Sequence, residues 1–92
     1  MSSMYKMGRT VGEFTKRYRE TNSLTQGDLA HKLGVHAQYV SNIERGTHKG
    51  AIAFAKSFSK IIKDKKLTTH LYNLAIDEKI DGLVDRMEKK DD

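Results

Sequence analysis

The sequence of 92 residues contains no cysteine, no proline and no tryptophan. Without cysteine the chain can form neither a disulfide framework nor a Cys-based zinc site, and redox roles based on thiols are excluded. Apolar runs are only a few residues long, and the first ten residues, MSSMYKMGRT, lack the apolar core of a signal segment. We therefore expect a cytoplasmic protein with no membrane segment.

Motifs that carry catalysis are missing as well. The chain has no glycine-rich phosphate loop, no HExxH sequence and no nucleophile with a base placed beside it. Histidine is the only candidate metal ligand of note, at His31, His36, His48 and His70. His31 and His36 lie on either side of a predicted turn, and no carboxylate or cysteine completes a usual ligand set. We predict a protein that is not an enzyme and that needs no metal or cofactor.

Positive charge is abundant, and it is unevenly distributed. The chain carries 17 Lys and Arg against 12 Asp and Glu, a formal net charge of +5. Residues 1–66 together carry a net charge of +8, whereas residues 67–92 carry −3. This asymmetry is typical of a basic working surface followed by an acidic accessory segment, and it favours an anionic partner.

The apolar residues recur at helical spacing, which predicts an all-α protein with one core. We expect helices at about 10–21, 25–33 and 37–44, a fourth with apolar residues Ile52, Phe54, Phe58, Ile61 and Ile62, and a fifth around Leu67, Leu71 and Leu74. Thr25 with Asp28 predicts a capping box, and Thr68 or Thr69 is expected to cap the fifth helix. The aromatic rings of Phe14, Phe54 and Phe58 are expected in the core.

A tight turn between two short helices is predicted within residues 26–45, QGDLAHKLGVHAQYVSNIER. Gly34 ends the first of these helices, because glycine adopts the left-handed conformation without steric cost. Ala30 is small where the second helix must cross. With Val40 and Ile43 facing inward, Gln38, Ser41, Asn42 and Arg45 are left on the outer face.

The segment LTQGDLAHKLGVHAQYVSNIERG resembles the signature of the Cro and phage-repressor (XRE-type) helix-turn-helix family, and the resemblance extends over residues 10–62. It implies a five-helix bundle of the lambda-repressor type, whose third helix lies in the major groove of DNA. The predicted organisation is an N-terminal arm (1–9), a DNA-binding domain (10–76) and a C-terminal helical extension (77–92).

Site residues follow from this resemblance. The positions expected to face base edges are Ala37, Gln38, Ser41 and Asn42. Those expected along the DNA backbone are Thr25, Gln26, Tyr39, Arg45, Thr47, His48 and Lys49, although Tyr39 has the alternative of packing beneath its helix. Gln38 and Asn42 each carry a carboxamide that can pair with adenine through two hydrogen bonds.

The resemblance also implies a structural salt bridge between Arg19 and Glu44. Where the family often has a hydroxyl capping residue before the third helix, this sequence has His36, so we expect a weaker start to that helix.

An amphipathic stripe near the C-terminus is not explained by the motif. It consists of Ile76, Ile80, Leu83, Val84 and Met87. The stripe could extend the core, pack against a second subunit or bind another protein, and we expect dimerisation. Gly82 inside it predicts a packing requirement or a local break.

The function expected from the sequence is that of a bacterial or phage transcription regulator. We expect a repressor that reads a palindromic operator as a homodimer, in the cytoplasm and associated with the nucleoid. The alternative is an antitoxin, or a protein-interaction module, that uses the same fold and binds another protein through its C-terminal helix.

Overall fold

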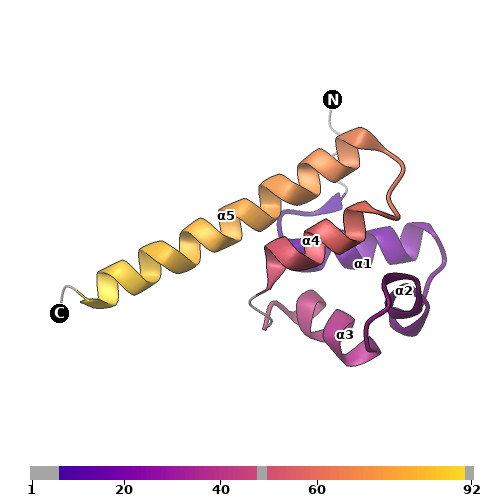
Figure 1. Cartoon of the computed structure of the whole chain (residues 1–92), viewed down its shortest axis with the longest axis horizontal. Helices are drawn as coiled ribbons and strands as arrows, with labels where there is room; N and C mark the ends of the chain where they lie inside the picture. The colour runs from indigo at the N-terminus through magenta and orange to yellow at the C-terminus, as the bar shows by residue number, and fades with distance from the viewer. Residues whose placement is uncertain (1–6, 48–49, 91–92) are drawn as a thin grey trace.

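Five α-helices make up the described part of the chain, and it contains no β-strand. The computed structural model describes residues 7–47 and 50–90. The helices are α1 (Val11–Thr21), α2 (Gln26–Leu33), α3 (Ala37–Arg45), α4 (Ala51–Ser59) and α5 (Lys65–Lys90) (Figure 1). The predicted all-α fold is confirmed. Within these two stretches no helix combines the length and apolar character needed to span a membrane.

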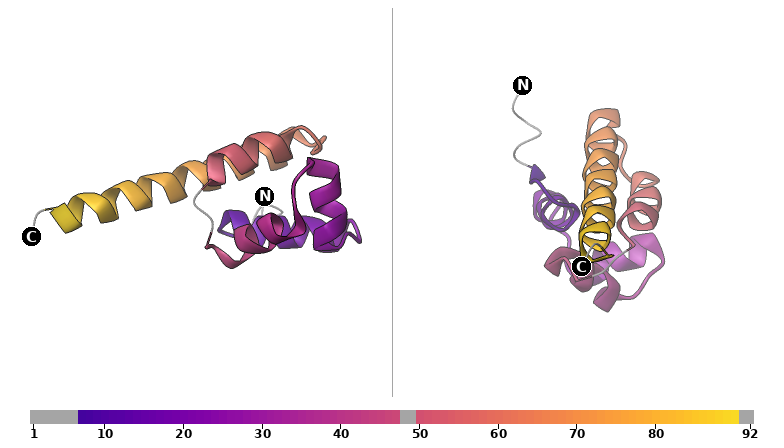
Figure 2. Two further views of the ribbon diagram at one scale, coloured as in Figure 1. Left: turned by 60° about the horizontal axis from the view of Figure 1, so that its bottom comes forward. Right: turned by 90° about the vertical axis from the view of Figure 1, so that its left-hand side faces the viewer.

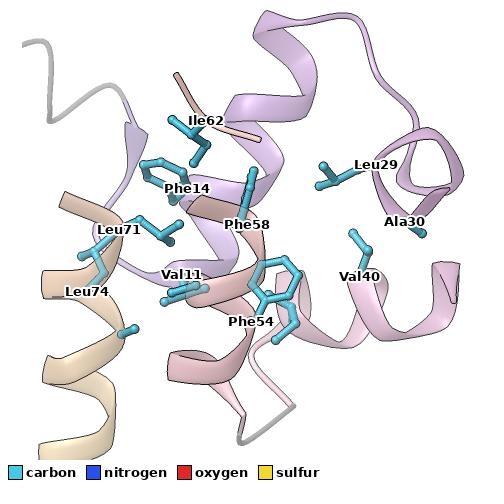
Figure 3. Packing of buried hydrophobic residues seen from close by; sticks show 13 residues of the cluster. Val11, Phe14, Leu29, Ala30, Val40, Phe54, Phe58, Ile62, Leu71 and Leu74 are labelled. Carbon is cyan, nitrogen blue, oxygen red and sulfur yellow. The ribbon is translucent and has the colours of Figure 1, made fainter. Parts of the chain in front are cut away.

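The core lies between α1, α4 and the first half of α5, and α2 and α3 close it on one side with Leu29, Ala30 and Val40 (Figure 3). Phe14, Phe54 and Phe58 are fully buried, as the sequence predicts. The Phe58 ring contacts three other rings, with centroid distances of 5.8 Å to Phe14, 5.0 Å to Tyr18 and 5.4 Å to Phe54. These near-perpendicular contacts add to the burial energy of the rings and fix α1 against α4.

The first two helices are both capped, and the capping box predicted for the second is present. Thr10 precedes α1 and accepts a hydrogen bond from the amide of Glu13. Thr25 and Asp28 form both bonds of the capping box, at 2.9 Å each. The hydrogen bonds from backbone and hydroxyl of Thr25 lower the pKa of the Asp28 carboxyl.

Two details of the sequence prediction are wrong. Helix α5 is capped neither by Thr68 nor by Thr69; it begins at Lys65, and the carboxylate of Asp64 accepts hydrogen bonds from the next free amides, at 2.8 and 3.3 Å. The fourth helix is shorter than predicted, because α4 ends at Ser59 and leaves Ile61 and Ile62 after it. Ile52 does lie in α4, but it is exposed, because it lies two residues before Phe54 and points to almost the opposite side of the helix.

Helix α5 runs from the bundle into solvent without interruption. Its first half packs on α4 and α1, and its second half extends past both (Figures 1 and 2). The fifth helix and the predicted C-terminal extension are thus one continuous helix. Gly82 causes no break, and apart from its own turn of helix no described atom lies within 4 Å of the position its Cβ would take.

The apolar residues of α5 change sides along its length. Leu71, Leu74 and Ala75 face the core. Ile76 and Ile80 follow Leu71 by five and nine residues, which places them about 140° and 180° further round the helix axis. The stripe formed by Ile76, Ile80, Leu83, Val84 and Met87, here called the α5 stripe, is exposed by 43–65%. It therefore does not extend the core of its own chain.

Candidate nucleic-acid interface

The corner between α2 and α3 is built as the sequence predicts. Gly34 has a φ of 72° in the left-handed region, and the amide of Val35 donates to the carbonyl oxygen of Ala30. Ala30 and Val40 are buried, so the two helices approach each other closely at the crossing. The chain thereby turns within a few residues and places α3 at the edge of the bundle (Figure 1).

The outer face of α3 is polar and accessible. Val40 and Ile43 hold the helix on the core, whereas Ala37, Gln38 and Arg45 are exposed, and Ser41 and Asn42 are half-buried. The residues predicted to face base edges therefore share one face of one helix. His36 precedes α3 and makes no capping hydrogen bond through its side chain, as expected from the missing hydroxyl.

Three side chains on this face form a small hydrogen-bonded array. Nε2 of Gln38 donates to Oδ1 of Asn42 at 3.0 Å, and Nη2 of Arg45 donates to the same oxygen at 2.6 Å. The resemblance implies Arg45 as a contact to the DNA backbone. In the structure it is bonded to Asn42, one of the predicted base-reading residues, and Asn42 in turn is bonded to Gln38.

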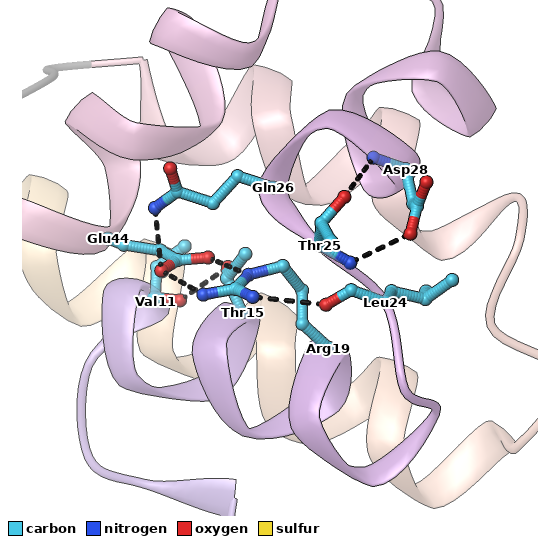
Figure 4. A network of polar contacts seen from close by, with 8 residues as sticks. All are labelled: Val11, Thr15, Arg19, Leu24, Thr25, Gln26, Asp28 and Glu44. Carbon is cyan, nitrogen blue, oxygen red and sulfur yellow. Dashed lines mark hydrogen bonds and ion pairs between the residues drawn. The ribbon is translucent and has the colours of Figure 1, made fainter.

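Beneath the start of α2 lies a second polar network, drawn in Figure 4. The Arg19 guanidinium and the Glu44 carboxylate form an ion pair through two bonds, of 2.5 and 2.8 Å, and their side chains are only 14% and 8% exposed. Arg19 also donates to the carbonyl oxygen of Leu24. Hydrogen bonding to Glu44 raises the pKa of Arg19, so the guanidinium stays charged.

Gln26, the predicted phosphate contact, belongs to this network. Its Nε2 donates to Oε1 of Glu44 at 3.2 Å, which fixes the side chain at the N-terminus of α2. Thr25 lies beside it with its hydroxyl oxygen engaged in the capping box. Both residues border the end of α3, because Glu44 comes from that helix.

Comparison with known proteins supports the same reading of this surface. A helix-turn-helix family model matches residues 16–56. An uncharacterized HTH-type transcriptional regulator of Methanocaldococcus jannaschii is 45% identical over 53 residues, which cover 53% of this chain and 80% of that protein. The chain belongs to the Cro/phage-repressor helix-turn-helix family. Membership supports a DNA-binding regulator rather than an enzyme.

A second helix-turn-helix relative is much longer than the segment it shares with this chain. It is an uncharacterized HTH-type transcriptional regulator of Archaeoglobus fulgidus, 35% identical over 52 residues, which cover 56% of this chain and 23% of that protein. No solved structure matches the chain significantly. Both relatives are archaeal, so the expected bacterial or phage origin gains no support from them.

The remaining predicted contacts of the helix-turn-helix lie around α3. The half-buried Tyr39 ring meets Phe54 edge-on at 5.6 Å, and burial raises the pKa of its hydroxyl. This contact favours the alternative in which the Tyr39 ring packs beneath α3. Thr47 is exposed and bonds the carbonyl oxygen of Asn42 after the helix end at Gly46. His48 and Lys49 lie outside the described residues.

Sequence reasoning missed Gly12, which sets the distance between α1 and the recognition helix α3. A Cβ at this position would lie 2.7 Å from the carbonyl oxygens of both Ile43 and Glu44. No real side chain fits there, so glycine permits the close approach that places Glu44 within reach of Arg19. The available signal was a glycine on the apolar side of an amphipathic helix, next to Val11.

Proposed function

We propose that the protein binds a specific double-stranded DNA operator as a homodimer and represses a nearby promoter by occupying it. Helix α3 lies in the major groove, where Ala37, Gln38, Ser41 and Asn42 face base edges. Regulation by occupancy needs no catalysis, which agrees with the regulator class of the family. The operator is palindromic, because two identical subunits present the same surface twice.

The observation that carries this proposal is the outer face of α3. Gln38, Asn42 and Arg45 offer amide and guanidinium groups to solvent, on a helix held from behind by Val40 and Ile43. A face that had lost DNA binding would instead carry acidic or large apolar residues. No acidic side chain occupies these outward positions.

Contacts to the DNA backbone come from the two ends of the motif. Gln26 lies at the N-terminus of α2, where free amides and the helix dipole favour a phosphate. At the other end, Arg45 is the last residue of α3, and Thr47, His48 and Lys49 follow it in the sequence. Thr25 and Tyr39 complete the predicted set. Such contacts position the domain without selecting sequence.

A binding titration tests the proposal. Fluorescence anisotropy with fragments of the source genome should reveal one or a few duplexes bound far more tightly than random DNA. Affinity should fall steeply with salt, because several phosphate contacts release counterions. Asn42→Ala should weaken the preference by about 1 to 3 kcal/mol for each half-site, whereas Asn73→Ala, the same change on an exposed position of α5, should leave it intact. Equal binding to every duplex would rule out a sequence-specific operator.

The homodimer is proposed on the α5 stripe. Its apolar residues are exposed, and the second half of α5 projects beyond the bundle (Figure 2), so a second copy of the chain offers a complementary apolar surface. In such a dimer the two α3 helices should lie about 34 Å apart, one turn of DNA. Of the acidic residues whose side chains the structure describes, Glu78 and Asp81 lie off the stripe by the helical period and do not oppose that pairing.

Sedimentation velocity over a range of protein concentrations tests the dimer. The full chain should sediment as a dimer, and Leu83→Glu should make it monomeric, because a charge would enter the apolar contact. Thr69→Glu adds the same charge at an exposed position in the first half of α5 and should not change the oligomeric state. A monomer at every concentration would contradict the dimer and favour the alternative, in which the stripe binds a different protein, as in an antitoxin.

A further inference from the structure

The hydrogen-bonded array on α3 restricts what each of its amides can offer to DNA. Asn42 is four residues after Gln38 and three before Arg45, so all three side chains lie on one side of the helix. Both neighbours donate to the same atom, Oδ1 of Asn42. The two readers predicted from the sequence are therefore coupled and do not act independently.

Arg45 determines which way the Asn42 amide points. A guanidinium carries only donors, so the atom 2.6 Å from Nη2 must be the acceptor oxygen of Asn42 and not its nitrogen. Because that atom is an acceptor, Gln38 can bond to it only by donating through Nε2. The bond from Arg45 is charge-assisted and therefore the stronger of the two.

The two carboxamides are left with different hydrogen-bonding capacities. Oδ1 of Asn42 is occupied twice, and within the described residues its Nδ2 has no partner, so Asn42 presents two donors and no acceptor. Gln38 uses one of its two amide hydrogens and keeps a second hydrogen and Oε1. Gln38 thus still offers a donor and an acceptor side by side.

We propose that Arg45 and Gln38 make Asn42 a donor-only reader that selects guanine, while Gln38 remains the reader of adenine. Guanine presents two adjacent acceptors in the major groove, O6 and N7, whereas adenine presents the N7 acceptor beside the N6 donor. The two donors of Asn42 match the two acceptors of guanine. The donor and acceptor of Gln38 match the acceptor and donor of adenine. This inference rests on the proposed function and specifies the operator that it recognises.

Arg45 is therefore a specificity-determining residue even if it touches no base. Its guanidinium has five N–H donors, so one bond to Asn42 leaves others for a phosphate. The same side chain can position the domain on the DNA backbone and orient the adjacent reader.

The test is a selection from a library of randomised duplexes, bound by the full-length protein and sequenced. Asn42→Ala first identifies the position that Asn42 reads, as the one whose preference is lost. There the unaltered protein should select guanine over adenine by about fivefold or more. Arg45→Met combined with Gln38→Ala frees Oδ1 of Asn42, so the preference at that position should move to adenine.

The selection has one matched control and four outcomes that would contradict a proposal. Arg17→Met removes the same charge from an exposed position of α1 and should change no base preference. Selection of adenine by the unaltered protein, or no change in the double variant, would overturn the inference and leave operator binding standing. No effect of Asn42→Ala at any position would also overturn it. A library without any enrichment would refute the proposed function itself.

Discussion

The amide nitrogen of Val11 donates a 2.7 Å hydrogen bond to a carboxylate oxygen of Glu78, 67 residues away in sequence. Val11 is the first residue of α1, and Glu78 lies near the middle of α5. A negative charge at a helix N-terminus is favourable, and here it also joins the DNA-binding bundle to the helix that carries the α5 stripe. His70 reinforces this connection through a 3.1 Å contact to the carbonyl oxygen of Gly8.

Replacement of the Glu78 carboxylate should weaken the connection between α1 and α5. We expect Glu78→Gln to lower the free energy of unfolding by about 1 kcal/mol, because a charge-assisted bond becomes a neutral one. The measurement is urea unfolding followed by circular dichroism. Asp77→Asn removes the same charge from the adjacent exposed position and should change little. Equal losses in both variants would contradict a specific role for Glu78.

Loss of the buried ion pair should cost more. Arg19→Met would leave Glu44 nearly buried with its main partner removed, and we expect a loss of about 3 kcal/mol in the free energy of unfolding. Arg17→Met, two residues earlier and exposed, should be close to neutral. Similar melting temperatures for the two variants would mean that the pair does not hold α1 to α3.

Two glycines in helices should respond to alanine with opposite signs. Gly12→Ala should destabilise the protein by about 3 kcal/mol, since its Cβ would force α1 away from α3. Gly82→Ala meets open space and should stabilise α5 by up to about 1 kcal/mol through helix propensity alone. Thermal unfolding of both variants measures the difference, and a stabilising Gly12→Ala would contradict the close helix contact.

The capping box predicts a dependence on pH. The folded state lowers the pKa of Asp28, chiefly through the Thr25 amide, so the carboxylate contributes stability above the pKa that aspartate has in the unfolded chain. This contribution is lost as the pH falls through the lower pKa of the folded state. Asp28→Asn should therefore melt earlier than the unaltered protein at pH 7, and the gap should close in acid. A gap that is constant with pH would argue against ionisation as its cause.

Much of the motif could be predicted because its determinants are local. A capping residue and its partner are three positions apart, as in Thr25 and Asp28, and a turn glycine such as Gly34 acts through its own backbone angles. The helical period alone places Phe14, Phe54 and Phe58 in the core. The start of α5 was misjudged because two threonines and Asp64 all had cap chemistry, and only the structure shows which one lies at the first turn.

Sequence alone was therefore enough to predict the set of helices, the corner between α2 and α3, and the polar face of α3. Each of these features depends on residues within one or two helical turns of one another. Three relationships came only from the tertiary structure. Gly12 lies against the backbone of α3, Glu78 accepts a hydrogen bond from the first amide of α1, and the α5 stripe faces away from its own core. These relationships depend on how distant helices are rotated and spaced against each other. Hydrophobic periodicity indicates that a helix has an apolar side, but it does not say what that side meets.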